Sequence, residues 1–296
     1  MHSLSSPDRP LLNRYLHLEG HELSVYAFEN IYIWKNLFEI KWQVIDGCLC
    51  IFFQDKTGSF LYLPPLGREI NPKVISESFG IMDKVNKNKQ VSRIENIEEK
   101  SIPSYKKMGL DCSLKSHDYL YSRASLATLR GNKFKSKRAA FNYFVKHNTF
   151  EYLPFVRTDA PSCVALYKRW MKERAASGKD RVYRGMLEDN LNSFVTMLEG
   201  YRHLDLTGRV VKIKGKIKAF TFGFKLNLST FCILYEITDF SFKGLAQFIF
   251  SAFCQEQEEY EYINVMDDSG LDNLKKVKLS YRPVKLASAY IATRNE

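Results

Sequence analysis

The sequence lacks the cysteine and histidine patterns of a metal-binding or disulfide-rich protein. Its six cysteines are scattered and include no CxxC pair, so neither a zinc ribbon nor a disulfide framework is indicated. No HExxH motif occurs, and His17 and His21 have the flexible Gly20 between them. We therefore expect buried thiols and no metal site.

Long apolar runs are also missing. Residues 1–16 contain no apolar core of signal-peptide length, and the runs at 48–53 and 248–250 are far shorter than the ~20 residues of a transmembrane helix. We expect a soluble, cytoplasmic protein without a transmembrane segment. The 296 residues are enough for two domains, each with a substantial core.

Acidic residues are absent from Tyr119 to Phe150, a stretch that contains seven basic ones: Arg123, Arg130, Lys133, Lys135, Lys137, Arg138 and Lys146. The whole chain has a net charge of +11, from 44 Lys and Arg against 33 Asp and Glu, which attracts polyanions such as nucleic acid or an anionic membrane. The stretch is either a solvated helix face or a polyanion-binding surface.

Beyond Gly131 the basic stretch has helical periodicity. The expected apolar stripe consists of Phe134, Phe141, Phe144 and Val145. Arg138 lies near the centre of this stripe, so we expect it to pair with a carboxylate or with a ligand anion.

Runs of β-branched and aromatic residues alternate with helical patterns along the chain. In the first half we expect strands at 23–34, 39–53, 60–66, 90–97 and 118–121, with a turn at 46–47 and helices at 70–86 and 101–109. In the second half we expect strands at 151–156, 206–214, 216–224, 229–238, 262–265 and 284–291, and helices at 159–176, 184–200, 242–258 and after 268.

The stretch from Tyr262 to Pro283 combines a short strand, two carboxylates and a helix. Ser269 is the expected N-cap of that helix, with Asp272 three residues later as a variant capping box. Lys278 shares the apolar face of Leu271 and Leu274. Its ammonium either snorkels to water or is held at a cleft beside Asp267, Asp268 and Tyr281.

The element order of the second half resembles the GNAT acyltransferase fold, and the first half repeats it more loosely. Three motifs, LATLRGNKFKSKRAAFNYF (126–144), YEITD (235–239) with Gly244-Leu-Ala246, and INVMDDSGLDNLKKVKLSYRP (263–283), are similar to the C-terminal domain of phosphatidylglycerol lysyltransferase. This resemblance implies an α/β protein with mixed sheets, composed of two tandem GNAT-like domains at 1–130 and 150–296. We expect a basic helix at 131–149 to bridge them.

The resemblance also implies a reaction, because characterised relatives, including the Fem-type transferases, move an aminoacyl group from a tRNA to a lipid or a peptidoglycan precursor. Such a transfer needs a base for the nucleophile and donors for the oxyanion. Glu236 is the candidate base, or else a structural partner of Arg138 or Lys278, and Asp268 is a second candidate. Lys278 and Tyr281 are candidate stabilisers. Substrate-binding candidates are Arg130, Lys133, Lys137, Arg138, Asn264, Asp267 and Arg282.

Coenzyme A is the other donor to consider. GNAT acetyltransferases hold its pyrophosphate at a helix N-terminus with a Gln or Arg followed by small residues. Here Gly244 and Ala246 are the candidate cofactor-binding residues, but the leading Gln or Arg is absent. Met266 also stands where many family members have a carboxylate.

Three functions therefore remain open at this stage. The first is transfer of an aminoacyl group from aminoacyl-tRNA to a small-molecule, peptide or lipid-headgroup acceptor. The others are acyl-CoA-dependent N-acylation and a catalytically silent protein that binds RNA or another polyanion. The sequence does not determine the oligomeric state.

Overall fold

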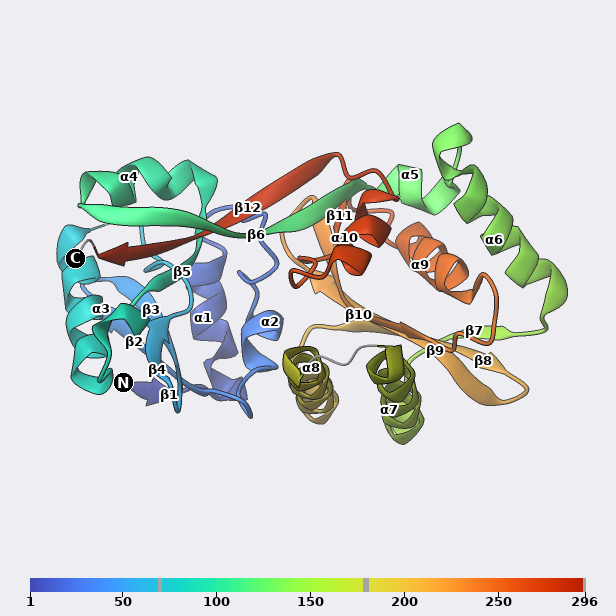
Figure 1. The fold of residues 1–296 in the computed structure, drawn as a ribbon, viewed down its shortest axis with the longest axis horizontal. Coiled ribbons are helices and arrows are strands. Elements are labelled where there is room, and N and C mark those ends of the chain that lie inside the picture. Colours follow the sequence, from blue (N-terminus) through green and yellow to red (C-terminus); the bar gives the residue numbers. More distant parts are fainter. Residues whose placement is uncertain (69–70, 178–180, 295–296) are drawn as a thin grey trace. The chain divides into compact units, whose positions relative to one another are not determined.

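The computed structural model describes residues 1–68, 71–177 and 181–294 (Figure 1). The chain forms two compact units, and each combines separate segments. The first comprises Met1–Tyr119, Met266–Asp272 and Leu286–Glu296, and the second comprises Leu120–Val265 and Asn273–Lys285. This division differs from the predicted 1–130, 131–149 and 150–296, because the C-terminal segment returns to the first unit and residues 131–149 lie within the second.

The first unit contains a mixed sheet. Its strand order is β1 (His2–Ser3), β2 (Glu39–Ile45), β3 (Cys48–Asp55), β4 (Gly58–Leu61), β5 (Ile94–Glu98), β12 (Lys285–Arg294) and β6 (Leu110–Ser122). β4 and β5 pair in parallel, whereas β1–β2, β2–β3, β3–β4 and β5–β12 are antiparallel. The helices are α1 (Arg9–Leu16), α2 (Phe28–Tyr32), α3 (Pro72–Val85) and α4 (Ile102–Lys107), with short 3-10 turns at Ser6–Asp8, Lys89–Val91 and Glu99–Ser101.

The hairpin predicted at 39–53 is confirmed as β2 and β3, with its turn at Asp46–Gly47. The strand predicted at 23–34 is wrong, because its centre is the helix α2. All five residues of α2 are buried. A short segment covered on every side shows no period that separates helix from strand.

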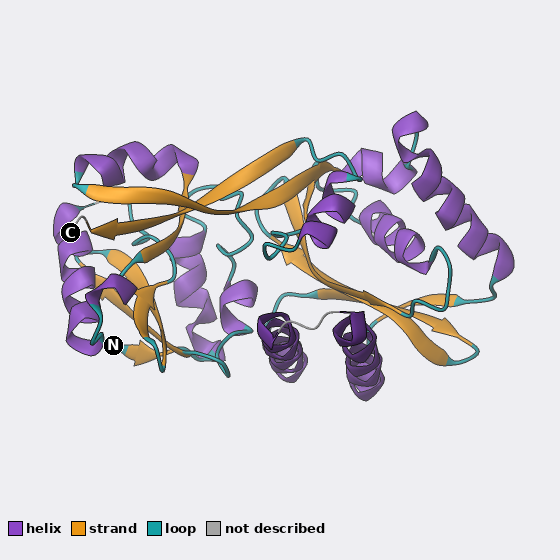
Figure 2. Ribbon diagram, viewed as in Figure 1, coloured by secondary structure: helices purple, strands orange, loops and turns teal. Residues whose placement is uncertain are grey.

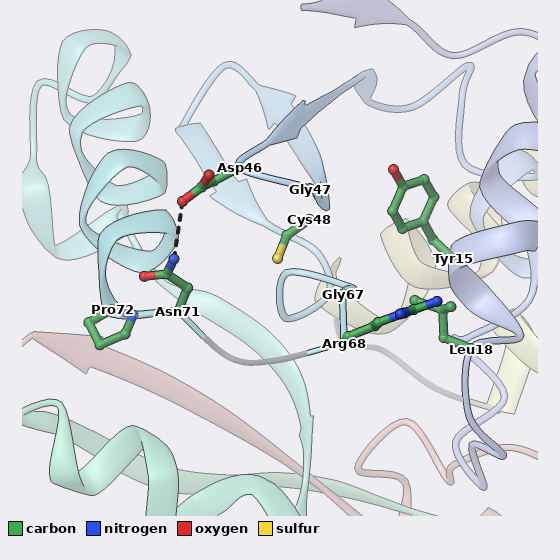
Figure 3. A pocket seen from close by; sticks show the side chains of 9 residues that line it. All are labelled: Tyr15, Leu18, Asp46, Gly47, Cys48, Gly67, Arg68, Asn71 and Pro72. Atoms are coloured by element: carbon green, nitrogen blue, oxygen red, sulfur yellow. Dashed lines mark hydrogen bonds between the residues drawn. The ribbon is translucent and has the colours of Figure 1, made fainter.

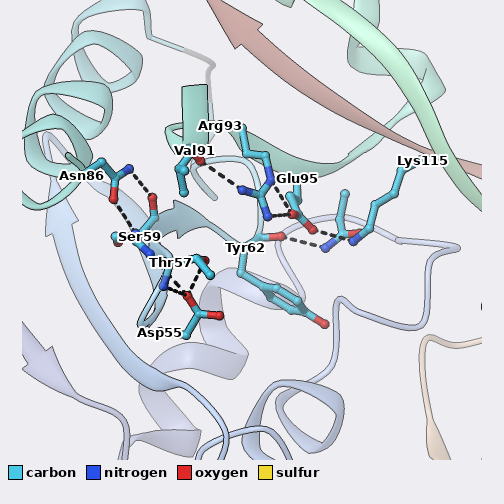
Figure 4. Close-up of polar contacts among 11 residues, drawn as sticks. Asp55, Thr57, Ser59, Tyr62, Asn86, Val91, Arg93, Glu95 and Lys115 are labelled. Atoms are coloured by element: carbon cyan, nitrogen blue, oxygen red, sulfur yellow. Dashed lines mark hydrogen bonds and ion pairs between the residues drawn. The ribbon is translucent and has the colours of Figure 1, made fainter. Parts of the chain in front are cut away.

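Buried polar groups of the first unit are paired with one another (Figure 4). The Glu95 carboxylate accepts from Arg93 Nε at 2.7 Å and from Lys115 Nζ at 2.6 Å. The Asn86 amide donates to the Ser59 carbonyl at 2.7 Å and accepts from the Ser59 N–H at 2.6 Å. These bonds satisfy groups that would otherwise destabilise the core.

The second unit contains another mixed sheet, with the order β6, β11 (Tyr262–Asn264), β10 (Thr230–Thr238), β9 (Lys216–Lys225), β8 (Thr207–Ile213) and β7 (Glu151–Pro154). Its pairs are antiparallel except for β10 and β11, which are parallel. The helices are α5 (Arg123–Thr128), α6 (Lys135–His147), α7 (Ala160–Ser177), α8 (Arg181–Gly200), α9 (Leu245–Glu256) and α10 (Asp272–Leu279), with 3-10 turns at Asn132–Phe134, Arg157–Asp159 and Tyr201–His203.

Helices cover both faces of this sheet, with α7 and α8 on one side and α6 and α9 on the other (Figures 1 and 2). α9 contacts β9 and β10 directly, and α6 packs on α9. The strands and helices predicted for the second half are therefore confirmed in type and order, apart from the 177–180 break, of which residues 178–180 lie outside the described residues.

The helix predicted beyond Gly131 is confirmed as α6, but its apolar stripe is only partly as expected. Phe134 and Phe144 are buried, and Phe141 packs against the same core cluster. Val145 is 43% exposed. The buried face is the one that contacts α9, and Val145 lies ~100° around the helix from Phe144.

Candidate functional site

Glu236 lies in β10 at the centre of the second unit's sheet. The pairing of β10 with β9 shifts register between Ile233 and Tyr235, just before this residue. Such a bulge re-aims the neighbouring side chain. The Glu236 Oε2 atom is buried without a hydrogen-bond partner among the described residues. Burial raises the pKa of the Glu236 carboxyl to about 8.

Tyr281 is a predicted site residue that lies near enough to Glu236 to interact with its charge. Burial raises the pKa of its phenol, the Glu236 charge raises it further, and a hydrogen bond with the Gln247 side chain lowers it. The ring packs edge-on to Phe250 with centroids 4.9 Å apart. The phenol therefore stays protonated at neutral pH and can donate a hydrogen bond.

Lys137 of α6 also contacts Tyr281. Its Nζ lies 4.2 Å from the centroid of the Tyr281 ring, a cation–π contact. Burial lowers the pKa of the Lys137 ammonium. β10, α6, α9 and the segment after α10 thus bring together Glu236, Lys137, Gln247 and Tyr281.

Two further residues near this group, Cys254 and Arg123, were not predicted as site residues. Burial and the Glu236 charge raise the pKa of the Cys254 thiol, whereas Arg123 lowers it. The Arg123 Nε is buried without a partner among the described residues. Arg123 belongs to the acid-free stretch and could have been selected on that ground. No sequence pattern marks Cys254 or Gln247.

Lys278 is half-buried, and its ammonium donates to the Val265 carbonyl at 2.6 Å. The Tyr121 hydroxyl donates to the Lys278 carbonyl at 2.9 Å. Asn264 is fully buried in β11, opposite Leu120. Lys278 therefore has a backbone contact within the second unit, and its expected role beside Asp267, Asp268 and Tyr281 stays a prediction.

The predicted N-cap of α10 is wrong. The helix begins at Asp272, and Ser269 has the left-handed φ of 52° within a turn that also includes Gly270. The expected face of Leu271, Leu274 and Lys278 is half-buried, whereas the other residues of α10 are exposed. The helix begins later than predicted because Asp267 and Asp268 first fold the chain into side-chain-capped turns.

Those turns occupy both acids, which belong to the first unit. Asp267 accepts from the Ser269 N–H at 3.1 Å. Asp268 accepts from the Gly270 N–H at 3.0 Å and from the Tyr119 hydroxyl at 2.5 Å. Met266 stands where the family resemblance implies a carboxylate, and its backbone has a left-handed φ of 62°.

Among the described residues Arg138 contacts backbone carbonyls and no carboxylate, and its expected pairing with a ligand anion stays a prediction. Its Nη1 donates to the carbonyls of Leu129 at 2.5 Å and Gly131 at 3.2 Å. Leu129 adopts a left-handed φ of 48° at the end of α5, which leaves backbone carbonyls for the guanidinium. Of the other predicted binding residues, Arg130, Lys133 and Arg282 are exposed.

The entry to α9, where a GNAT fold would hold coenzyme A, does not fit a pyrophosphate. A Cβ at Gly244 would lie 2.0 Å from the Ala140 carbonyl oxygen, so α6 packs directly on this end of α9. The nearby cations Arg169 and Lys218 are already paired with Asp239, at 2.6 and 3.0 Å. Gly244 and Ala246 therefore serve helix packing here.

Within the described chain, one group has the composition of a metal site, formed by Glu19, His21 and Glu98 of the first unit. The Lys100 ammonium pairs with Glu19 at 2.9 Å and with Glu98 at 3.1 Å. His21 Nδ1 lies 3.0 Å from Glu98. The carboxylates already have a cation. Burial raises the pKa of Glu98, but the hydrogen bond and charge of His21 and the hydrogen bonds from the Glu22 N–H and Lys100 lower it to about 2.

The first unit also has a surface pocket of about 670 Å³ (Figure 3). The residues that line it are Tyr15, Leu18, Asp46, Gly47, Cys48, Gly67, Arg68, Asn71 and Pro72. Asn71 donates to Asp46 at 3.1 Å across its rim. None of the predicted site residues lines this pocket.

Solved structures similar to this chain share its whole length. A conserved protein of unknown function from Bacteroides thetaiotaomicron is 25% identical with a TM-score of 0.88, covering 99% of both chains. L-PGS from Bacillus licheniformis is 16% identical with a TM-score of 0.68, covering 100% of this chain and 94% of that one. FemX is 9% identical with a TM-score of 0.65, covering 98% and 96%.

The fold is that of tandem GNAT proteins, one of which matches at 8% identity with a TM-score of 0.52 over 99% and 98% of the chains. No curated protein sequence matches this chain. No helix among the described residues is long and apolar enough to cross a membrane. The family model described as "Phosphatidylglycerol lysyltransferase, C-terminal" matches residues 18–293, and the chain therefore belongs to that family.

Proposed function

We propose that this protein is an acyltransferase of the GNAT superfamily that moves an aminoacyl group from aminoacyl-tRNA to an amine or hydroxyl acceptor. The observation that carries the proposal is Glu236, a half-buried residue of a central strand whose Oε2 atom is buried without a hydrogen-bond partner among the described residues. With a pKa of about 8, it is matched to proton transfer at neutral pH. The family match and the likeness to L-PGS support a lysyl or related aminoacyl group.

In this reaction the acceptor attacks the ester carbonyl of the aminoacyl-tRNA. The Glu236 carboxylate takes the proton that the nucleophile loses as the new bond to the carbonyl carbon forms. The ester C–O bond then breaks, and the proton returns to the leaving ribose oxygen. Tyr281, protonated and next to Glu236, donates a hydrogen bond to the developing oxyanion.

The other predicted catalytic residues fit this chemistry less well. Lys278 donates to a backbone carbonyl, and Asp268 accepts two hydrogen bonds in a turn. Lys137, which contacts Tyr281, is better placed than Lys278 to supply positive charge.

Two alternatives are disfavoured by specific residues. An acyl-CoA donor would need the α9 entry, where α6 packs on Gly244 and Asp239 takes the cations. A silent scaffold would gain nothing from Glu236, because a buried carboxyl without a partner lowers stability. Such a cost is typical of functional sites.

The test is Glu236→Gln, which keeps the size of the side chain and removes the base. Single-turnover transfer from lysyl-tRNA and from a mixed aminoacyl-tRNA pool would be measured with phosphatidylglycerol micelles and with amine acceptors. We expect a loss of about 10²- to 10⁴-fold. Glu258→Gln, an exposed neighbour of α9, is the matched control. Transfer by Glu236→Gln at the wild-type rate would exclude Glu236 as the base.

A further inference from the structure

Thr221 lies directly opposite Glu236 on the neighbouring strand of the second unit's sheet. β9 and β10 are antiparallel, and their register pairs Glu236 with Thr221. Side chains of residues paired in this way lie on one face of the sheet, with Cβ atoms about 4.5 to 5.5 Å apart. At that spacing, rotation of the glutamate side chain brings its carboxyl within hydrogen-bond reach of the threonine hydroxyl.

Aromatic packing shows which face of the sheet these two side chains occupy. Phe220, the residue before Thr221, stacks on Phe194 of α8 with ring centroids 4.8 Å apart. Tyr235, the residue before Glu236, packs on the same ring at 5.1 Å. Because successive side chains of a strand alternate between faces, Thr221 and Glu236 both point to the opposite face, which α9 covers (Figure 1).

Each of the two side chains has a buried polar atom without a partner. The Thr221 Oγ1 and the Glu236 Oε2 make no hydrogen bond among the described residues. Thr221 is fully buried, whereas Glu236 is half-buried. A buried hydroxyl that bonds to nothing lowers stability, and native proteins rarely keep one. Since the two atoms belong to facing residues, each is the expected partner of the other.

The neighbour on the other side of Thr221 leaves its hydroxyl available. In the register of β8 with β9 this neighbour is Arg209. Its guanidinium pairs with Glu256 of α9 at 2.6 Å and donates to the Gly208 carbonyl at 3.0 Å. The charge of Arg209 is therefore compensated without Thr221.

The other groups near the carboxyl are less suited to hold its buried oxygen atom. A hydrogen bond joins the Tyr281 phenol to the Gln247 side chain, and the Lys137 ammonium lies over the Tyr281 ring. The thiol of Cys254 is only a weak donor. Arg123 acts on that thiol, and its own buried Nε has no partner among the described residues.

We propose that Thr221 is the positioning residue of Glu236: its hydroxyl bonds to the buried Oε2 atom, so that Oε1 stays directed at the substrate. A hydroxyl suits both stages of proton transfer, because it donates to an ionised carboxylate and accepts from a protonated carboxyl. The carboxyl can then gain and lose a proton without turning. The positioning role rests on the proposed function of Glu236, whereas the hydrogen bond itself does not.

The first experiment detects the hydrogen bond through folding stability, in urea titrations at about pH 6 and about pH 9, on either side of the Glu236 pKa of about 8. Loss of a donor to the carboxylate raises its folded-state pKa further, so Thr221→Val should lose stability relative to wild type as the carboxyl ionises. One pKa unit is tenfold, and we expect a relative loss of up to about tenfold in the folding equilibrium constant. Thr221→Ser keeps the hydroxyl and loses a methyl group, so it should differ from wild type equally at both pH values.

The control is Thr221→Val made in Glu236→Gln, whose neutral side chain does not ionise. In this background the effect of Thr221→Val should be the same at both pH values. A threonine that only fills space gives a pH-independent difference in either background, and that result would overturn the proposal. A pH-dependent loss that persists in Glu236→Gln would also overturn it, because the titrating partner would then be another group.

The second experiment tests the role in transfer. At about pH 7, kcat/KM of Thr221→Val should fall about tenfold, because a smaller share of Glu236 is ionised. Thr221→Ser should transfer nearly like wild type, although it is the less stable variant. If Glu236→Gln loses transfer and Thr221→Val does not, the positioning role is wrong and the proposed function stands. If Glu236→Gln transfers like wild type, both fail, and the first experiment still decides on the hydrogen bond.

Discussion

Glu236 combines two properties that a purely structural residue would not have. It lies near the end of a central strand, and its buried Oε2 has no hydrogen-bond partner within the described chain. Folding removes the Oε2 atom from water without a compensating hydrogen bond from the described residues, which destabilises the ionised carboxyl and raises its pKa to about 8. A site that works as a base near neutral pH needs such a shift.

The pH profile of the reaction should report this pKa. Glu236 must be deprotonated to accept a proton, so kcat/KM should rise about tenfold per pH unit below a pKa of about 8 and level off above it. The measurement is the rate of aminoacyl transfer between pH 6 and about 9, under conditions in which the aminoacyl-tRNA stays intact.

A profile that is flat through this range would contradict the assignment. The pH dependence of folding stability provides the control. The pKa of Glu236 is higher in the folded than in the unfolded chain, so its ionisation on unfolding lowers stability as pH rises from the unfolded value toward about 8. Glu236→Gln should then be more stable than wild type in this window.

Lys278 should be important for stability and less so for chemistry. Lys278→Met keeps most of the apolar stem but removes the donor to the Val265 carbonyl. Because the residue is half-buried, water can partly replace the bond, and we expect a loss of about 1 kcal/mol in the free energy of unfolding. Urea titration measures this value. A variant that is as stable as wild type and inactive would show that the ammonium acts on the substrate.

Individual site residues could be predicted from the sequence only in part. Glu236 and Tyr281 were predicted because a carboxylate at the end of a strand and a tyrosine after a helix fit the family motifs, and the structure places them near enough to interact. Their neighbours Gln247 and Cys254 could not be predicted, because the spacing of residues in the sequence does not show which side chains of α9 lie near β10. The hydrogen bonds of Arg138 depend on the left-handed turn at Leu129, and leucine is not a residue type that predicts such a turn.

At the scale of elements, the long periodic segments were predicted correctly and the short ones were not. α6 and α9 have enough turns for their period to show, and β8 to β10 have clear turns between them. α2 has only five residues, all buried, so its apolar composition resembles a strand. The start of α10 was misplaced because Asp267 and Asp268 fix side-chain turns before the helix begins.

α6 is also the element through which polyanion binding should be measured. Its exposed cations flank a buried face that packs on α9. Each phosphate contact contributes roughly 0.7 to 0.9 to the slope of log affinity against log salt. Lys133→Ala with Lys135→Ala should therefore reduce the slope for tRNA binding by roughly 1.4 to 1.8.

The matched control for this slope is Lys216→Ala with Lys225→Ala, which removes two exposed cations of β9 in the same unit. This variant should keep the wild-type slope in fluorescence anisotropy titrations. Equal slopes for all three proteins would remove α6 from the tRNA surface, whereas equal losses in both variants would indicate only a general attraction by net charge.

At the scale of the whole molecule, the chain passes repeatedly between its two units. β6 begins in the first unit and ends in the second, and the last strand, β12, returns to the first. A contiguous division into domains, as the sequence predicted, could not anticipate this path. The acid-free stretch begins at Tyr119, but no change of composition marks Leu286. The pairing partner of a strand depends on sheet register, which the sequence alone does not show.

The first unit should therefore depend on β12, which follows the strands of the second unit in the sequence. β12 pairs with β5 through Ala289 opposite Glu98 and Ala292 opposite Ile94, and both alanines are buried. A chain that ends at Lys285 leaves the core edge of β5 without its partner strand and exposes the apolar side chains that β12 covers. Hydrogen exchange should then show lost protection in β4, β5 and α3, while β8 to β10 of the second unit stay protected. Protection of β5 equal to that in the full chain would show that the first unit folds without β12, and loss in both units would show that they unfold as one.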